Sequence, residues 1–325
     1  MTYKIDLTDK RIIKEIDLDC RRPLSLIAKN IKISQQRLQY RLKNLEKEGV
    51  IPFYYTLIDT SLLGYTFYRV MLRFQNTTAQ KENEIINHLI QHPNTFWIAT
   101  CSGRWDLLVD FFSKNITEFD YIIQQFLEKY FDFISEKNIA TIVESKQYSR
   151  SFFLQNSEHK EFKKSYGGTP IIIPLDNINK KILKIISNNP TINNLDIGRL
   201  LKIDRNTVKN RIDKMISLNI IIGFRAWFQI TTVSYHSYVL IIRLNKVKSN
   251  IQNKLLSFAR AKNNIIYFNK ILGDWDFEYD IETQSEEEFH ALLTEIKNLF
   301  SEDIRDYEIL KTTRDFKLNY VPPLD

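Results

Sequence analysis

The chain repeats itself at a constant offset of 170 residues, and this internal duplication restricts the fold more than any other feature. Matched pairs include Asp6 and Asp176, Arg41 and Arg211, Gly103 and Gly273, Trp105 and Trp275, and Asp106 and Asp276. A single offset along the whole chain indicates an old duplication with little insertion. The period is too long for a solenoid unit and predicts two copies of a domain pair.

Each copy begins with three short amphipathic segments that predict helices. In the first copy, Leu38, Leu42 and Leu45 recur at helical spacing between a candidate N-cap, Ser34, and a stop signal, Gly49. The expected helices are 8–17, 24–31 and 34–48, repeated at 177–188, 195–202 and 204–218. Two short helices joined this tightly indicate a helix-turn-helix, whose second helix enters the DNA major groove. The alternative is an ordinary helical pair in another kind of domain.

The outward faces of the two candidate recognition helices differ. We expect DNA contact from Ser34, Gln35, Gln36, Arg37, Gln39, Tyr40, Arg41 and Lys43, and from Arg205, Asn206, Thr207, Lys209, Asn210 and Arg211. Gln and Asn suit adenine, whereas Arg and Lys suit guanine or phosphate. Arg41 and Arg211 are present in both copies, which favours a shared phosphate contact or a structural role over base recognition.

Positive charge coincides with these helices. The net charge is +7; residues 1–50 hold twelve Lys and Arg against seven Asp and Glu, and residues 171–222 hold nine against four. The rest of the chain is therefore net acidic. A charge run is commonly a solvated face, but its coincidence with both motifs predicts contact with phosphates.

After each helical unit the pattern becomes strand-like and follows the order βαββαβ. The expected strands 67–74 and 237–244 precede helices 79–91 and 249–261, two strands around a Gly-x-Trp-Asp turn, helices 116–129 and 285–299, and final strands 138–146 and 307–314. This order predicts an α+β chain with two ferredoxin-like sandwiches, each a four-stranded sheet with helices on one face. The predicted domains are 1–52, 53–150, a linker 151–174, 175–222 and 223–325.

Composition excludes several other classes. An apolar content of 43% indicates a folded protein, and no apolar run is long enough to span a membrane. The N-terminus lacks a secretory signal, so we expect a cytoplasmic protein. Two cysteines, Cys20 and Cys101, are too few for a disulfide framework, and five ungrouped histidines predict no metal site. No cofactor is expected.

Both halves resemble the Lrp/AsnC (feast/famine) family of transcription regulators. In the first half the resemblance rests on Asp6, Asp9-Lys10, Ile27-Ala28, Arg41-Leu42, Leu45, Gly49-Val50-Ile51 and Gly103–Asp106; in the second it rests on Asp176, Ile197, Arg211-Ile212 and Gly273–Asp276. Asn219 replaces Gly49, and Gly198 replaces Ala28. A glycine inside a helix costs about 1 kcal/mol relative to Ala, which weakens the expectation that the second copy binds DNA.

The resemblance implies double-stranded DNA as partner, sensor (RAM-type) sheet domains that pair, and an effector, often an amino acid, near the glycine turn. The residues concerned are Gly103, Arg104, Trp105, Asp106, Gly273, Asp274, Trp275 and Asp276. Alternatively, the two tryptophans lie in the core and the two aspartates fix the hairpin. Arg104 and Asp274 differ in charge, so two such pockets would not be equivalent.

Three functions follow from these patterns. The first is a regulator whose halves form a pseudo-dimer within one chain and read an asymmetric site, with further homo-oligomerisation through the sheet domains as the family implies. The second is a sirohaem decarboxylase of the same architecture, which uses histidines in the sheet domain; the strands around Gly103 and Gly273 contain none. The third is a sensor or assembly module that no longer binds DNA, against which the two basic segments speak.

Overall fold

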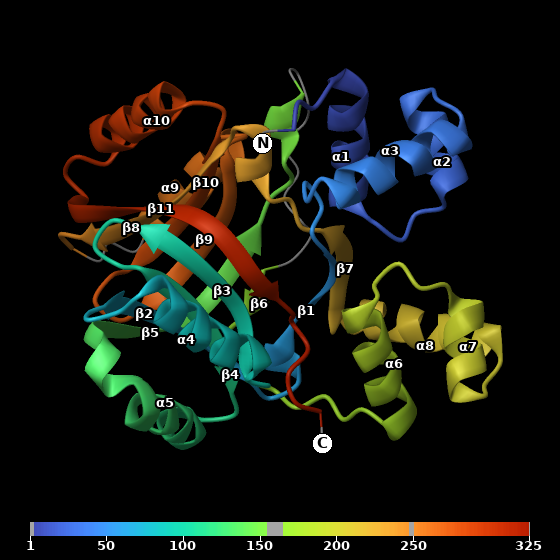
Figure 1. Cartoon of the computed structure of the whole chain (residues 1–325), viewed down its shortest axis with the longest axis horizontal. Coiled ribbons are helices and arrows are strands. Elements are labelled where there is room, and N and C mark those ends of the chain that lie inside the picture. The colour runs from blue at the N-terminus through green and yellow to red at the C-terminus, as the bar shows by residue number, and fades with distance from the viewer. Residues whose placement is uncertain (1–2, 155–164, 247–249, 325) are drawn as a thin grey trace.

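The computed structural model describes residues 3–154, 165–246 and 250–324, and its helices repeat at the expected offset (Figure 1). The first helical unit comprises α1 (Leu7–Leu18), α2 (Leu24–Ile31) and α3 (Gln35–Lys47). The second comprises α6 (Asn177–Asn188), α7 (Asn194–Leu201) and α8 (Arg205–Ser217). Every bound of the second unit is that of the first plus 170, which confirms the duplication.

The βαββαβ order is confirmed in both halves. The first half contains β2 (Thr66–Phe74), α4 (Ala79–Gln91), β3 (Thr95–Ser102), β4 (Leu107–Ser113), α5 (Ile116–Tyr130) and β5 (Ile134–Gln147). The second contains β8 (His236–Leu244), α9 (Ile251–Ala261), β9 (Ile265–Leu272), β10 (Phe277–Thr283), α10 (Glu286–Leu299) and β11 (Ile304–Leu318). Short 3₁₀ turns lie at Thr60–Leu62, Phe131–Phe133, Ser151–Phe153 and Ile230–Val233.

The two sheets close into one antiparallel barrel. The order β2-β4-β3-β11-β8-β10-β9-β5 ends where β5 pairs back onto β2. The final strands, expected at 138–146 and 307–314, are longer, and each pairs first within its own half and then with the other half. β11 pairs with β8 and continues along β3, while β5 pairs with β2 and continues along β9. Closure of the barrel removes the exposed edges that two separate sheets would have.

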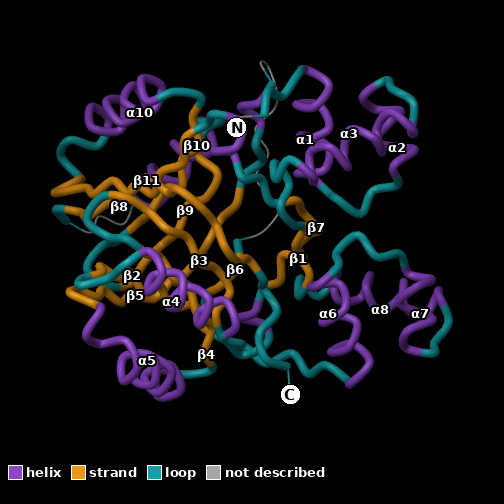
Figure 2. The backbone as a smooth tube through the Cα atoms, viewed as in Figure 1, coloured by secondary structure: helices purple, strands orange, loops and turns teal. Residues whose placement is uncertain are grey.

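Alternation along the strands separates an inner core from two outer cores. In β2, Phe67 and Met71 face the barrel interior, whereas Tyr68 and Leu72 pack with residues of α4 and α5. The second half repeats this with Tyr238, Leu240 and Ile242 in contact with α9 and α10. Figure 2 shows the strands gathered between α5 on one side and α10 on the other. Cys20 and Cys101 are both buried, and burial raises the pKa of each thiol to about 12.

The helical units are attached to the barrel through exchanged contacts. The strands that follow α3 and α8, β1 (Tyr54–Ile58) and β7 (Ile221–Ala226), pair with each other in a separate antiparallel ribbon. The core of the first helical unit is completed by Phe228, Ile230 and Val233 from the second half. On the other side, Thr56 of β1 donates to the carbonyl of Ile186 in α6 at 2.7 Å. Each helical unit is therefore packed against the connector of the opposite half.

The segment predicted as a linker is partly built into the fold. Phe153 is buried in the first helical core, and a short strand β6 (Tyr166–Gly167) pairs with β5. Residues 155–164 lie outside the described residues. Within the described ranges, none of the helices combines the length and the apolarity that crossing a bilayer requires.

Candidate nucleic-acid interface

The recognition candidate α3 forms for the local reasons that the sequence indicates. Ser34 accepts a hydrogen bond from the Arg37 amide at 3.2 Å, which satisfies a free donor of the first turn. Leu38, Leu42 and Leu45 are buried, and Gly49 closes the helix with a φ of 71°. Asn219 takes the same left-handed conformation in the second half, with a φ of 60°. The replacement of glycine at this position is therefore tolerated.

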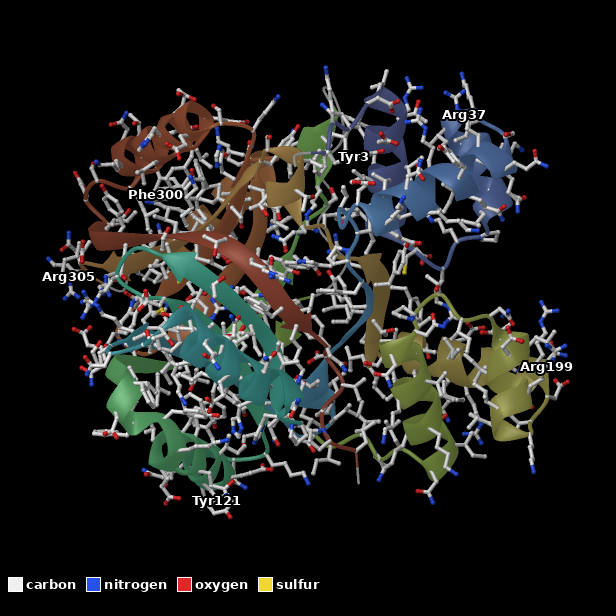
Figure 3. All side chains as sticks on the ribbon, in the orientation of Figure 1. Tyr3, Arg37, Tyr121, Arg199, Phe300 and Arg305 are labelled. Carbon is white, nitrogen blue, oxygen red and sulfur yellow. The ribbon has the colours of Figure 1, made fainter. Side chains whose placement is uncertain are left out.

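The opposite faces of α3 and α8 are open to solvent. The exposed residues are Ser34, Gln35, Gln36, Arg37, Gln39, Tyr40 and Lys43 in the first half, and Arg205, Asn206, Thr207, Lys209 and Asn210 in the second. Tyr40 is 66% exposed although it is aromatic, so it is not part of the core. Both helical units lie on the same side of the barrel, and Arg37 and Arg199 lie at the edge of these units that faces away from the barrel (Figure 3).

The two faces differ in available charge as well as in residue type. In α8, Lys209 is paired with Asp213 one turn later at 2.6 Å. The residue that matches Asp213 is Lys43, which adds a positive charge to α3 instead. The exposed face of α3 therefore combines amides with the cations Arg37 and Lys43, while α8 carries Arg205 at its first residue and a lysine paired with a carboxylate.

Arg41 and Arg211, which the sequence leaves between phosphate contact and a structural role, are held by carboxylates. Arg41 Nη1 donates to Asp6 at 2.6 Å and to the buried Asp9 at 3.0 Å. These ion pairs raise the pKa of Arg41 and join α3 to the start of α1. Arg211 repeats the arrangement with Asp176 at 2.6 Å and Asn179 at 3.0 Å. Both arginines therefore position the recognition helix.

Gly198 has a packing role that sequence reasoning missed. A Cβ atom at this position would lie 2.7 Å from the carbonyl oxygen of Ile203, in the turn between α7 and α8. The Ile203 amide donates to the Gly198 carbonyl at 3.0 Å, so the turn folds tightly back onto the helix. In the second unit a Cβ at this position would clash with that carbonyl oxygen, so Gly198 is not simply a defect of its helix.

The glycine turns expected to hold an effector are built into the barrel wall. Trp105 and Trp275 are 3% and 1% exposed. The carboxylate of Asp106 accepts a hydrogen bond from the backbone amide of Phe74 on the neighbouring strand at 2.7 Å, and that of Asp276 accepts one from Leu244 at 2.7 Å. A Cβ at Gly103 would lie 3.0 Å from the Ile309 carbonyl, and one at Gly273 would lie 2.7 Å from the Ala140 Cβ. These contacts correspond to the structural alternative for the turn.

Arg104 and Asp274, the residues that differ in charge between the two glycine turns, also have different partners. Arg104 lies 3.3 Å from Glu136, and both side chains are about half exposed. Asp274 accepts a hydrogen bond from Asn138 across the junction of the halves.

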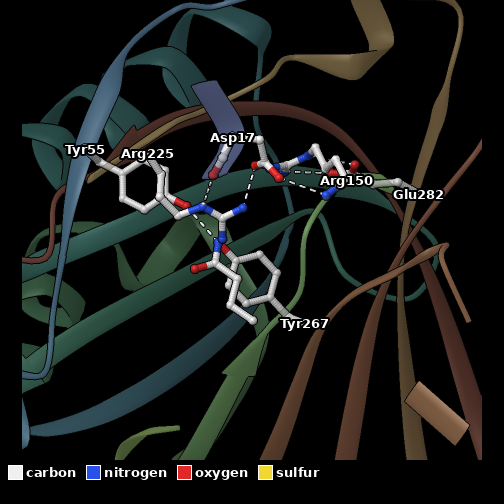
Figure 4. A network of polar contacts seen from close by, with 7 residues as sticks. Asp17, Tyr55, Arg150, Arg225, Tyr267 and Glu282 are labelled. Carbon is white, nitrogen blue, oxygen red and sulfur yellow. Dashed lines mark hydrogen bonds and ion pairs between the residues drawn. The ribbon is translucent and has the colours of Figure 1, made fainter. Parts of the chain in front are cut away.

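A buried charge network joins the first helical unit to the barrel, and sequence reasoning did not find it (Figure 4). Asp17, at the end of α1, accepts bonds from the Arg150 amide at 2.8 Å and from the guanidinium of Arg225 on β7. Arg150 also binds Glu282 of β10 through two nitrogens, at 2.8 and 2.9 Å. All four side chains are 7% exposed or less. The two carboxylates and two guanidiniums balance in charge.

The barrel interior contains a second group of ionisable side chains. Arg69 binds Asp110 at 2.7 and 2.8 Å and also contacts Glu278. Asp280 lies between Glu278 and Glu282 on the inner face of β10, and among the described residues its Oδ1 has no hydrogen-bond partner. Burial, together with the neighbouring carboxylates, raises the pKa of Asp280 to about 8. Asp280 lines two small cavities of about 30 and 20 Å³.

Comparison with known proteins places both helical units in families of helix-turn-helix domains. Residues 5–51 match a winged helix-turn-helix DNA-binding domain, and residues 175–216 match an AsnC-type helix-turn-helix domain. Both halves of the chain therefore resemble the Lrp/AsnC family of regulators. A similar protein is the HTH-type transcriptional regulator FL11 of Pyrococcus horikoshii, 29% identical over 36% of this chain and 77% of that protein. The proline dehydrogenase transcriptional activator of Rhodobacter capsulatus is 29% identical over 38% of this chain and 80% of its own length.

The whole tandem architecture has a counterpart of known structure. The sirohaem decarboxylase NirDL matches 97% of this chain and 93% of its own, with a TM-score of 0.61 and 15% sequence identity. At this identity the match shows the fold alone. The relatives by sequence are transcription regulators, each of which corresponds to somewhat more than a third of this chain.

Proposed function

We propose that this chain is a DNA-binding transcription regulator that reads an asymmetric site with two non-identical helix-turn-helix units. One observation carries the proposal: α3 and α8 expose different polar faces on the same side of one connected pair. The β1–β7 ribbon and the exchanged core contacts hold that pair to a common barrel. A duplex bound by both units would therefore be contacted at a set spacing, as with paired half-sites of symmetric dimers.

The exposed residues support different preferences in the two half-sites. Gln35, Gln36 and Gln39 on α3 suit adenine, whereas Arg205 on α8 suits guanine or a phosphate. Because Lys209 is neutralised by Asp213, we expect α8 to make fewer phosphate contacts than α3. The first unit would then supply more of the affinity, and the second would contribute mainly to the choice of sequence.

Selection of binding sites from random duplexes by the full chain tests this proposal. We expect two unlike half-sites; a selected site that is a perfect palindrome would contradict the asymmetry. Arg37→Ala and Arg205→Ala should each relax the preference in one half-site only. Lys137→Ala, an exposed cation on β5 of the barrel, is the matched control and should leave both half-sites unchanged.

Salt dependence separates a DNA-binding regulator from a sensor or assembly module. Fluorescence anisotropy with a nonspecific duplex should show affinity falling as salt rises, because released counterions dominate phosphate binding. Removal of Lys43, an exposed cation on α3, should reduce the slope of log affinity against log salt by about one, as expected for a phosphate contact. Absence of salt-dependent binding would favour the module without DNA contact.

Regulation by a small effector is part of the proposal. The buried tryptophans and backbone-bound aspartates of the glycine turns leave those residues occupied by structural contacts. We therefore expect an effector to bind elsewhere in the sensor domains.

Sirohaem decarboxylation is the second candidate, favoured by the whole-chain fold match to NirDL. The side chains do not favour it. The interior cavities of about 30 and 20 Å³ are far smaller than the roughly 150 Å³ that holds a benzene ring. Among the described histidines, His88 and His92 lie on or next to α4, His290 on α10 and His236 at the start of β8. Titration with sirohaem tests the candidate, and a saturable Soret band would revive it.

A further inference from the structure

A pocket of about 260 Å³ lies in the second sheet domain, outside the interface described above. It is enclosed by the C-terminal end of α10, the start of β11 and the outer face of β8. Its apolar wall includes Leu240, Ile242, Leu293, Ile296, Phe300 and Ile304. Figure 3 labels Phe300 below α10 and Arg305 at the outer edge of the barrel.

Comparison of the two halves explains why the pocket is there. The residue that matches Ile296 is Phe126, which is buried in the core of the first half and contacts Tyr130 with ring centroids 5.3 Å apart. The residue that matches Ser301 is Phe131. Phe131 is 66% exposed, so within the packed core the second half has exchanged one aromatic side chain, Phe126, for the smaller Ile296. A deletion of this size in a packed core leaves a cavity unless the surroundings collapse.

The mouth of the pocket has gained positive charge at matching positions. Lys297 replaces Leu127 and Arg305 replaces Ser135. The Lys297 ammonium lies over the ring of Tyr307, another lining residue, 5.3 Å from its centroid. The acidic residue of the mouth, Asp306, is paired with Arg243 at 3.3 Å. An apolar cavity with two cations at its entrance is complementary to an apolar acid.

We propose that this pocket binds a small carboxylic acid with an apolar body, whose carboxylate pairs with Lys297 and Arg305. The volume exceeds the roughly 150 Å³ that accommodates benzene in an apolar cavity, so a ring or a short alkyl chain fits below the charged head. A free carboxylic acid and an amino acid share this chemistry. The site is independent of the DNA-binding proposal, because the ligand is measured on the protein without DNA.

Isothermal titration of the full chain with three matched probes tests the site. The probes are 3-phenylpropionate, L-phenylalanine and the uncharged 3-phenylpropanol. We expect saturable binding of at least one of the two acids and at least tenfold weaker binding of the alcohol, since a charge-assisted contact is lost. Whichever acid binds more tightly shows whether the amino group is accepted. Absence of binding by both acids, or equal binding of the alcohol, would overturn the proposal.

Variants that restore first-half residues locate the binding site. Ile296→Phe should abolish binding by filling the pocket, and Lys297→Leu and Arg305→Ser should each weaken it about tenfold. The two rim variants change exposed side chains, so they test the site even if Ile296→Phe perturbs folding. Lys129→Leu, an exposed cation in the last turn of α5, is the control and should bind as the unmodified chain does. Unchanged binding in all three pocket variants would place the ligand elsewhere.

Discussion

Replacement of Asp17 by Asn should destabilise the whole chain, because it removes one of four balanced buried charges. Asp17 accepts from the Arg150 amide and from two guanidiniums, and its side chain is 1% exposed. The Asn side chain has nearly the same shape, so little packing is lost. What remains is a net positive charge shared by Arg150 and Arg225, with Glu282 as their remaining carboxylate.

The expected loss is about 3–5 kcal/mol of unfolding free energy, the cost of breaking a buried ion pair from one side. Most of that cost comes from the stranded guanidinium rather than from the lost attraction. Removal of Arg225 in the same chain therefore offsets part of it. Arg225→Met alone leaves an excess negative charge, whereas Asp17→Asn with Arg225→Met restores neutrality around the Arg150–Glu282 pair.

Urea unfolding of the four proteins in this double-mutant cycle, followed by circular dichroism and tryptophan fluorescence, measures the coupling. We expect the double variant to lose about 2 kcal/mol less unfolding free energy than the sum of the losses in the two single variants. Ser187→Ala provides the control at the matching position, where a hydrogen bond to Asn319 replaces the charges. It should cost about 1 kcal/mol. Additive losses within about 0.5 kcal/mol would refute the charge-balance argument.

Three further predictions follow from other contacts. Arg41→Ala should lower unfolding free energy by about 1–3 kcal/mol, and by more than Arg211→Ala does, because only the first leaves a buried carboxylate unpaired; urea unfolding compares the two. Gly198→Ala should lower the melting temperature in spite of better helix propensity, because its Cβ meets the Ile203 carbonyl; an increase would contradict the packing role. Asp280 has a folded pKa of about 8 against 3.8 unfolded, so its contribution is full below about pH 4 and is lost as pH rises through 8. Asp280→Asn should therefore flatten the pH dependence of stability between 4 and 8, as measured by urea unfolding at several pH values.

Local features were predictable because local patterns encode them. The spacing of Leu38, Leu42 and Leu45 sets a buried stripe on a helix regardless of what covers it, and the structure buries all three. Ser34 and Gly49 mark the ends through backbone hydrogen bonding and a positive φ, both of which act within a few residues. The exposed faces of α3 and α8 follow by exclusion from the buried stripes.

Other features depended on which residues meet, and periodicity does not encode partners. The lengths of β5 and β11 were underestimated because the pattern does not show which strands they meet. Residues 134–137 of β5 pair with β2, and residues 315–318 of β11 pair with β3 of the opposite half. Arginine is a residue type that commonly binds phosphate, yet the fold places Arg41 beside Asp6 and Asp9.

The sequence alone determined that this protein is a duplicated chain with two basic helix-turn-helix units and two βαββαβ sheets. The duplication is visible by comparing the sequence with itself, and helix caps and burial periods act within a few residues. Only the tertiary structure decided that the sheets close into one barrel and that each helical unit packs on the opposite half. It also decided that Asp17, Arg150, Arg225 and Glu282 meet from four distant segments. The same holds for the pocket below α10, which is lined by Ile296 where the other half has Phe126. The local spacing of apolar residues indicates which side of an element is buried, whereas the contacts between distant segments form only when the fold brings those segments together.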